Sequence, residues 1–162
     1  MPYNPVPRLK GFSYTGLKHY SLTICVDRRR HVFVNRDAVD LVTAELVRTY
    51  EQSRFAVIAY CFMPDHLHLL VEAVTDQANL PAFVRLFKQC SAFHWKARYG
   101  EQLWQRSYFE HVLREGESPV KAARYLLANP VRAGLVERPE DYPFVGSATM
   151  TVRHLLYSIT QE

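Results

Sequence analysis

Two apolar segments with a very short connection between them constrain the fold of this chain most strongly. Residues 55–62 and 66–73 are both rich in aliphatic, β-branched and aromatic residues, which is the composition of strands. Only Met63-Pro64-Asp65 separates them, and a connection this short joins antiparallel neighbours. The sequence therefore predicts a hairpin at the centre of the chain.

The second of these segments carries two histidines at alternate positions. Strand alternation places His66 and His68 on one face and sends Leu67, Leu69 and Val71 to the other. Two converging imidazoles are the start of a metal site, although alternate histidines on a strand also occur as a solvated or hydrogen-bonded face. The spacing alone leaves both interpretations open.

A short helix is predicted further along the chain. Ser118 can cap it, Pro119 suits its first turn and Pro130 marks its end, so the helix should run from Pro119 to Asn129. Its sheet-facing stripe is expected to be apolar and to consist of Val120, Ala123, Leu126 and Leu127.

Another face of this helix should carry an amine, a phenol and an amide, because Lys121, Tyr125 and Asn129 recur at intervals of four. A phenol can attack phosphorus and form a phosphotyrosine that conserves the phosphodiester energy. A divalent cation would assist it, with Asn129 as an oxygen ligand and Lys121 beside a phosphate. Alternatively, Tyr125 packs at the helix–sheet boundary and Asn129 simply ends the helix.

Three sequence segments, in a fixed order along the chain, carry a resemblance to a known family. The segments Ala59–Glu72, Leu103–Arg114 and Tyr125–Val136 resemble the REP-associated tyrosine transposases, which are single-tyrosine relatives of the transposases with a histidine-hydrophobic-histidine metal motif. The similarity runs from about Tyr20 to about Ser147. Phe144 and Gly146 depart from it, since tryptophan and serine are expected there.

The resemblance implies a role for each residue of the site. His66 and His68 would be paired metal ligands, Tyr125 the nucleophile that attaches to a 5′ phosphate, and Asn129 the third ligand. The wider group carries glutamine where this chain has Asn129, which reaches one carbon less far. Magnesium or manganese is the expected cation, and zinc is compatible with the same ligands. The expected substrate is a repetitive extragenic palindrome folded as a hairpin, with a single-stranded tetranucleotide at its foot.

The order of elements predicts an α+β fold with an antiparallel sheet. The expected architecture is a ferredoxin-like (RRM-like) βαββαβ palm, plus a C-terminal helix that carries the tyrosine across the open face. The strands are expected at 20–26, 55–62, 66–73 and 107–113, and the helices at 36–50, 80–99 and 119–129. We expect one domain over 1–162, with an extended basic arm at 1–15 and a short tail at 148–162 that covers the active face, docks elsewhere or frays.

Basic residues indicate a polyanionic partner. The chain of 162 residues has a net charge of +4, which favours polyanions without proving one. Candidate DNA contacts are a basic loop at a strand end, a helix in which basic residues alternate with His94 and Trp95, and the tyrosine helix; these candidates are Arg28, Arg29, Arg30, Arg85, Lys88, Lys96 and Lys121. A solvated loop is the alternative for the arginine run. The buried face of helix 80–99 is expected to comprise Phe83, Phe87, Cys90 and Phe93.

Together these features predict a metal-dependent enzyme that cleaves and rejoins single-stranded DNA through a 5′-phosphotyrosine. Two other classes stay open: a ferredoxin-like module that binds RNA or DNA without cutting it, and a metal-dependent nuclease that uses water. Glu110 or His111 is a candidate for orienting a ligand. Tyr108 is a second phenol without a helical asparagine partner.

Location and assembly are also expectations from the sequence. The chain shows no signal peptide and no apolar run long enough for a bilayer, so it should be cytoplasmic, without membrane association, and able to reach the nucleoid. Its three cysteines indicate neither a disulfide framework nor a zinc cluster. A monomer acting in cis is expected, and a dimer is the alternative.

Overall fold

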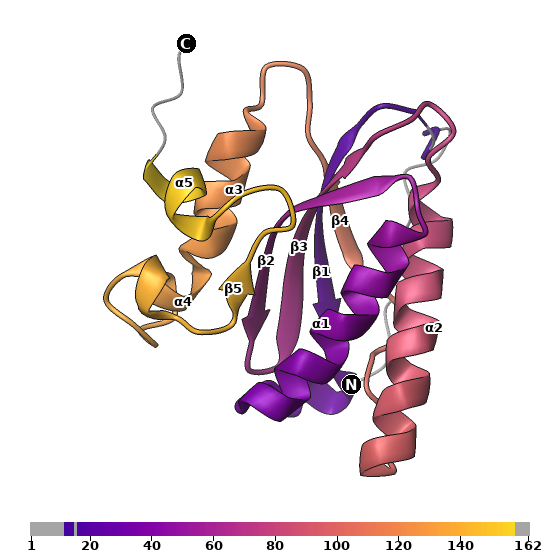
Figure 1. Cartoon of the computed structure of the whole chain (residues 1–162), viewed down its shortest axis with the longest axis vertical. Coiled ribbons are helices and arrows are strands. Elements are labelled where there is room, and N and C mark those ends of the chain that lie inside the picture. The colour runs from indigo at the N-terminus through magenta and orange to yellow at the C-terminus, as the bar shows by residue number, and fades with distance from the viewer. Residues whose placement is uncertain (1–11, 15, 158–162) are drawn as a thin grey trace.

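An antiparallel sheet forms the centre of the computed structural model, which describes residues 12–14 and 16–157. The strands are His19–Cys25 (β1), Phe55–Met63 (β2), His66–Ala73 (β3), Phe109–Val112 (β4) and Val145–Gly146 (β5). Their spatial order is β4-β1-β3-β2-β5, and each neighbouring pair is antiparallel. The predicted ferredoxin-like palm is confirmed (Figure 1), and β5 adds an edge strand that was not predicted.

The predicted hairpin is present, with Pro64 and Asp65 between β2 and β3. Met63 pairs with His66 at its closed end, and the pairing continues to Phe55 opposite Ala73. A register shift between Val57 and Ala59 marks a bulge in β2. The short turn fixes the register of β3, and thereby which of its side chains face each side of the sheet.

Two long helices, Arg36–Glu51 (α1) and Leu80–Tyr99 (α2), cover one face of the sheet side by side (Figure 1). Each begins at an asparagine whose side chain accepts a hydrogen bond from the backbone two or three positions into the helix: Asn35 from Ala38 and Asn79 from Ala82. Gly100 ends α2 in the left-handed conformation, with φ of 71°. The core beneath these helices includes Leu67, Leu69 and Val71, as predicted.

The predicted buried face of α2 is partly wrong. Phe83 and Phe87 are buried, but Phe93 is 70% exposed and Cys90 is only half-buried. Steps of four residues from Phe87 lead to Ser91 and then to Trp95, which is 2% exposed. Ser91 fits there because its hydroxyl accepts a hydrogen bond from the indole of Trp104 at 2.8 Å. The buried stripe therefore continues through a polar residue.

The other face of the sheet carries three short helices: Pro119–Leu127 (α3), Asn129–Arg132 (α4) and Val152–Tyr157 (α5). A second apolar cluster joins Ala123, Leu126 and Leu127 of α3 to sheet residues that include Cys61 and Leu70. Leu155 of α5 is buried in the same cluster, and its carbonyl accepts a hydrogen bond from Arg124. This part of the predicted tail therefore docks on α3, whereas 158–162 and most of the predicted arm lie outside the described residues.

The helix predicted from Pro119 to Asn129 is two helices. Proline has no N–H to donate to the carbonyl four residues back, so the ladder of α3 stops at Leu127, and Pro130 lies in the first turn of α4 instead of after the last helix. The strand predicted at 107–113 is shorter, at Phe109–Val112. The carbonyls of Gln105 and Ser107 accept from the amine of Lys88, which turns this stretch away from regular pairing. No helix in the described segments is long and apolar enough to cross a membrane.

The departure of Gly146 from the family pattern has a local cause. Gly146 of β5 pairs with Tyr60 of β2, and a Cβ at Gly146 would lie 2.2 Å from the Tyr60 hydroxyl oxygen and 2.3 Å from Cζ. A rigid ring at that distance cannot give way without displacing the strand. The Tyr60 side chain therefore occupies the space that a serine would need.

We expect Gly146→Ala to lower the free energy of unfolding by roughly 1–3 kcal/mol, because it forces the Tyr60 ring and β5 apart. A double-mutant cycle with Tyr60→Ala, measured by urea denaturation, checks the cause. The double variant should lose clearly less stability than the sum of the single losses. Additive losses would contradict a steric conflict between these two residues.

Candidate functional site

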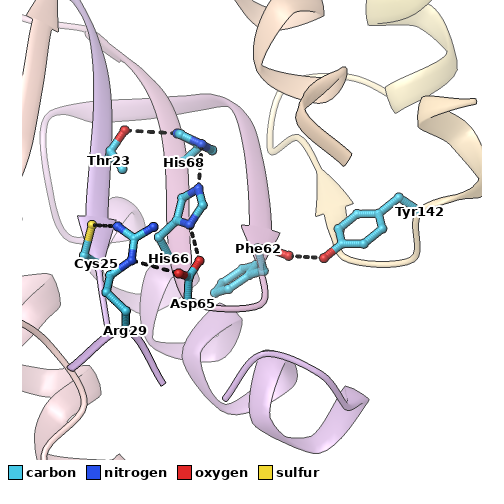
Figure 2. Close-up of polar contacts among 8 residues, drawn as sticks. All are labelled: Thr23, Cys25, Arg29, Phe62, Asp65, His66, His68 and Tyr142. Carbon is cyan, nitrogen blue, oxygen red and sulfur yellow. Dashed lines mark hydrogen bonds and ion pairs between the residues drawn. The ribbon is translucent and has the colours of Figure 1, made fainter. Parts of the chain in front are cut away.

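The two histidines of β3 converge on the sheet face opposite α1 and α2. Their Nε2 atoms lie 2.9 Å apart and the rings are nearly perpendicular. His66 pairs with Cys25 and His68 with Thr23 in the register between β1 and β3. Figure 2 shows both rings pointing toward one another from the same strand. The convergence expected from strand alternation is therefore present.

The outer nitrogens of both rings have partners. His66 Nδ1 lies 2.6 Å from Asp65 Oδ1, and His68 Nδ1 lies 3.0 Å from the Thr23 hydroxyl oxygen (Figure 2). When each Nδ1–H donates to its oxygen, the Nε2 lone pairs are left facing the space between the rings. A carboxylate or hydroxyl that binds Nδ1 fixes the orientation of the imidazole ring. This arrangement suits histidines that bind a cation through Nε2.

Asp65 is itself held in place by Arg29. Arg29 Nε donates to Asp65 Oδ2 at 2.8 Å, and its Nη1 lies 2.8 Å from Cys25 Sγ (Figure 2). Partial burial opposes ionisation of Asp65, but the hydrogen bonds from His66 and Arg29 prevail and lower its pKa. A charged carboxylate thus stands behind His66.

Both imidazoles are neutral at neutral pH. Burial lowers the pKa of His66, and burial together with the neighbouring His66 and Arg132 lowers the pKa of His68 to about 3. A neutral imidazole is the form that binds metal ions. Burial therefore favours the form of each imidazole that can bind a cation over the protonated form.

A cavity of about 660 Å³ brings His68 together with the tyrosine helix. His66, whose Nε2 lies 2.9 Å from that of His68, is not among the lining residues. It is lined by residues from β1, β3, the end of β4, α3 and the start of α4, among them Thr23, His68, His111, Lys121, Tyr125 and Asn129. The second apolar cluster fixes α3 on the sheet. The fold thus places a phenol, an amine and an amide around one imidazole face.

Tyr125 points outward from α3, since its side chain is 68% exposed. The helix begins as predicted, with the Ser118 hydroxyl accepting from the Lys121 N–H and Pro119 in the first turn. The guanidinium of Arg132 lies over the Tyr125 ring, with Cζ 3.8 Å from the ring centroid. Tyr125 therefore does not pack at a helix–sheet boundary, which was the alternative for this residue.

Asn129 is oriented by the proline that follows it. Its Nδ2 donates to the Leu126 carbonyl at 2.8 Å, which is the acceptor that an N–H at position 130 would use in a continuous helix. Oδ1 is consequently turned the other way and accepts from Arg132 Nη2 at 2.7 Å. Asn129 thus lines the cavity even though it is not on the same helix as Tyr125.

The donor atoms at the cavity fit a hard divalent cation. The described segments contain no cluster of three or more His, Cys, Asp or Glu residues that could hold a metal ion. A third protein ligand of another type would be Asn129, whose side chain lines the cavity together with His68. Two nitrogens and one amide oxygen would leave positions for phosphate oxygens and water.

Comparison with known proteins places the chain in a family. Residues 15–126 match the model of the family described as "Transposase IS200 like". The chain belongs to the IS200-like transposases. It is 28% identical over 146 residues to a Haemophilus influenzae protein whose name assigns it to the REP-associated tyrosine transposases, with 83% of this chain and 81% of that protein covered. It is 34% identical over 113 residues to the ISDra2 transposase TnpA of Deinococcus radiodurans, with 64% of this chain and 79% of that protein covered.

Solved structures share the fold. A REP-associated tyrosine transposase bound to a REP hairpin matches with a TM-score of 0.72 and 18% sequence identity, over 86% of this chain and 82% of that one. Membership of the IS200-like family selects an enzyme that cleaves and transfers DNA strands from the classes that the sequence left open. The family match contains His66, His68 and Tyr125 and stops before Asn129.

The basic candidates occupy different places in this transposase. Arg28 is the most exposed of the arginine run, whereas Arg29 binds Asp65 and Arg30 binds Glu101 and two backbone carbonyls. Lys121 lines the cavity. Arg85, Lys88 and Lys96 lie on α2, which covers the other face of the sheet. Trp95 is buried in the core and cannot stack on a base, and DNA contact by the basic residues of α2 stays a prediction.

The remaining candidates from the sequence are His111, Glu110 and Tyr108, and they differ in whether they reach the cavity. His111 lines the cavity and lies 3.1 Å from Glu117, which also accepts from the Arg114 N–H. Glu110 points away and accepts from the Tyr14 hydroxyl. Tyr108 is buried, at 5% exposure, whereas Tyr125 is open to solvent. The geometry thus favours Tyr125 as the phenol that can meet a substrate.

Three contributors were not recognised in the sequence. Asp65 was expected only as part of the turn, although its carboxylate contacts the His66 ring. Thr23 reaches His68 only through the strand register, for which one sequence holds no local signal. Arg132 follows Asn129 by three residues, which is a helical spacing. The predicted helix ended at Asn129, however, so Arg132 fell outside it.

The histidine pair should make stability depend on pH when no divalent cation is present. The pKa of His68 lies far below its ordinary value of 6.5 in the folded chain, so only the unfolded chain binds this proton as the pH falls from 6.5 toward 3. Stability should therefore decrease over that window. We expect His68→Gln to flatten this dependence in urea denaturation with EDTA, and an unchanged slope would contradict a neutral, buried His68.

Proposed function

We propose that this transposase cleaves and rejoins single-stranded DNA beside a REP-type hairpin, through a covalent 5′-phosphotyrosine at Tyr125 and a divalent cation bound by His66, His68 and Asn129. The observation that carries the proposal is the single cavity that Tyr125, Asn129, Lys121 and His68 share. The cavity brings together a phenol, an amide, an amine and an imidazole, which are the groups that this proposal needs.

The chemistry is a transesterification at phosphorus. The Tyr125 oxygen forms a bond to the phosphorus as the bond from phosphorus to the 3′ oxygen breaks, and the phenolic proton leaves as the 3′ oxygen gains one. The number of phosphoester bonds is unchanged, so the 3′ hydroxyl can reverse the step on the same or another strand. Cleavage and joining are one reaction in two directions.

Each residue of the proposed site has a separate role in this reaction. The exposed position of Tyr125 lets its hydroxyl reach a phosphate from solvent, and Lys121, one turn earlier on α3, can neutralise a neighbouring phosphate. Asp65 and Thr23 hold the imidazoles with Nε2 inward. A bound Mg²⁺ or Mn²⁺ would polarise the phosphoryl oxygen and offset charge on the displaced 3′ oxygen.

The choice of DNA rests on the relatives. The matched structure contains a REP-associated tyrosine transposase with a REP hairpin, and the Haemophilus influenzae relative carries the same family name. Arg28 and Lys121 are exposed basic residues at or beside the site face, which suits a phosphate backbone. A hairpin with a single-stranded foot is therefore the proposed substrate, and action as a monomer in cis is the proposed assembly.

We expect the wild-type protein with Mg²⁺ or Mn²⁺ and a labelled hairpin oligonucleotide to form a DNA–protein adduct that survives a denaturing gel. Tyr125→Phe removes the attacking oxygen and His66→Ala removes a ligand, so each variant should lower adduct formation by at least about 10³-fold. The oligonucleotides should come from palindromes that flank the gene of this protein.

A matched control is Tyr157→Phe, because Tyr157 is another exposed phenol on a helix but binds Glu140 outside the cavity. This variant should form the adduct at the wild-type rate. DNA cleavage without an adduct would instead support a nuclease that uses water, and hairpin binding without cleavage would support a non-catalytic module.

Asp65→Ala should weaken Mn²⁺ binding by roughly 10–100-fold, because it frees the His66 ring to rotate and to change its tautomer. Isothermal titration with Mn²⁺ alone measures the affinity. Asp27→Ala is the control, since it removes a nearby carboxylate that forms an ion pair with Arg28 and not with an imidazole. Equal effects of both substitutions would show that only net charge matters.

A further inference from the structure

Arg132 contacts two residues of the proposed site, although the sequence did not single it out. Its guanidinium lies over the Tyr125 ring, with Cζ 3.8 Å from the ring centroid. One of its nitrogens, Nη2, donates to Asn129 Oδ1 at 2.7 Å and to the Tyr125 carbonyl at 2.8 Å. One cation thus contacts both the proposed nucleophile and the proposed amide ligand.

The backbone of α3 and α4 fixes this position. Pro130 leaves the Leu126 carbonyl without its helical N–H donor, and Asn129 Nδ2 fills that place. The amide oxygen is then presented along α4, where Arg132 lies one turn later. The carbonyl of Tyr125 provides the second acceptor. Three local contacts therefore hold the guanidinium beside Tyr125 and Asn129.

Arg132 also brings a positive charge to this oxygen, because a guanidinium is a permanently charged group in proteins. A positive group therefore already holds the amide oxygen that a divalent cation would use.

We propose that Arg132 is an exchangeable cation of this site, which rests on the function proposed above. Before the metal ion binds, Arg132 holds Asn129 Oδ1 and steadies the Tyr125 ring. When a divalent cation takes that oxygen, the guanidinium releases it and stays over the ring. Its N–H groups then bind the non-bridging oxygens of the phosphodiester that Tyr125 attacks.

The chemistry of arginine fits this second position. A planar guanidinium offers paired N–H donors that match two phosphate oxygens, and its weak hydration lets it lie on an aromatic ring at the same time. Lys121 cannot do both, because an ammonium is a point charge on a flexible chain. Lys121 also precedes Tyr125 by a helical turn, whereas Arg132 follows it.

Arg132→Ala should raise the affinity for Mn²⁺ and lower the rate of adduct formation. Without DNA, Mn²⁺ should bind on the order of tenfold more tightly, because the competing donor and its charge are removed. With saturating Mn²⁺, adduct formation on the hairpin in a single turnover should be on the order of 10²-fold slower, because a charged donor to the phosphate is lost. Arg132→Lys should recover only part of the adduct rate.

The control is Arg36→Ala, since Arg36 is another exposed arginine over an aromatic ring, Phe144, but lies on α1. It removes the same charge and should change neither quantity. A second control places Arg132→Ala in an Asn129→Ala background, where most of the gain in Mn²⁺ affinity should disappear. Free Mn²⁺ in each titration is measured by electron paramagnetic resonance.

The outcomes separate the possible failures. Damage to α4 alone would weaken Mn²⁺ binding and slow the reaction together, so unchanged or weaker Mn²⁺ binding by Arg132→Ala overturns the exchange. Tighter binding with an unchanged adduct rate overturns the phosphate contact, and a gain that persists in full without Asn129 overturns the competition for its oxygen. Absence of any adduct with the wild type would overturn the proposed function, while the Mn²⁺ titration would still decide whether Arg132 competes for the cation site.

Discussion

Strand β3 lies in the middle of the sheet, hydrogen-bonded to β1 on one side and to β2 on the other, and its pleat has to serve two faces at once. Leu67, Leu69 and Val71 enter the core beneath α1 and α2, while His66 and His68 emerge on the opposite face. A shift of one residue would bury both imidazoles and expose the three aliphatic side chains. The cost of that exchange keeps the histidine pair in place.

The tyrosine reaches this pair because a second, smaller apolar cluster holds α3 against the open face. Burial of Leu126 and Leu127 turns Tyr125 outward along the rim of the cavity. The break at Pro130 then works together with the helix, since it presents Asn129 and Arg132 from α4 toward the same space. The packing of α3 and the missing N–H of Pro130 thus position the polar side chains of the site.

The charge of each group in the site is set by its neighbours, and the net charge of the chain does not reveal it. Burial keeps the imidazoles neutral, Arg29 compensates Asp65 behind His66, and Arg132 lies over the Tyr125 ring. The modest net charge of +4 reveals none of this arrangement. Of the basic residues that suggested DNA binding, several pair with carboxylates or carbonyls of the protein itself, as Arg30 and Lys88 do. A basic residue in a sequence is therefore weak evidence for a phosphate contact.

The sequence by itself determined the order of the four main strands and of α1, α2 and α3, the faces of β3 and the start of α3, because these depend on local pleat, spacing and capping. Resemblance to a known family then supplied the roles expected of His66, His68 and Tyr125. Tertiary structure decided what depends on distant partners: that Trp95 is buried and Phe93 exposed, that Thr23 lies behind His68, that Tyr60 excludes a side chain at Gly146, and that Arg132 joins Tyr125 to Asn129. Each of these follows from strand register or helix packing, which bring together residues that a single sequence leaves far apart.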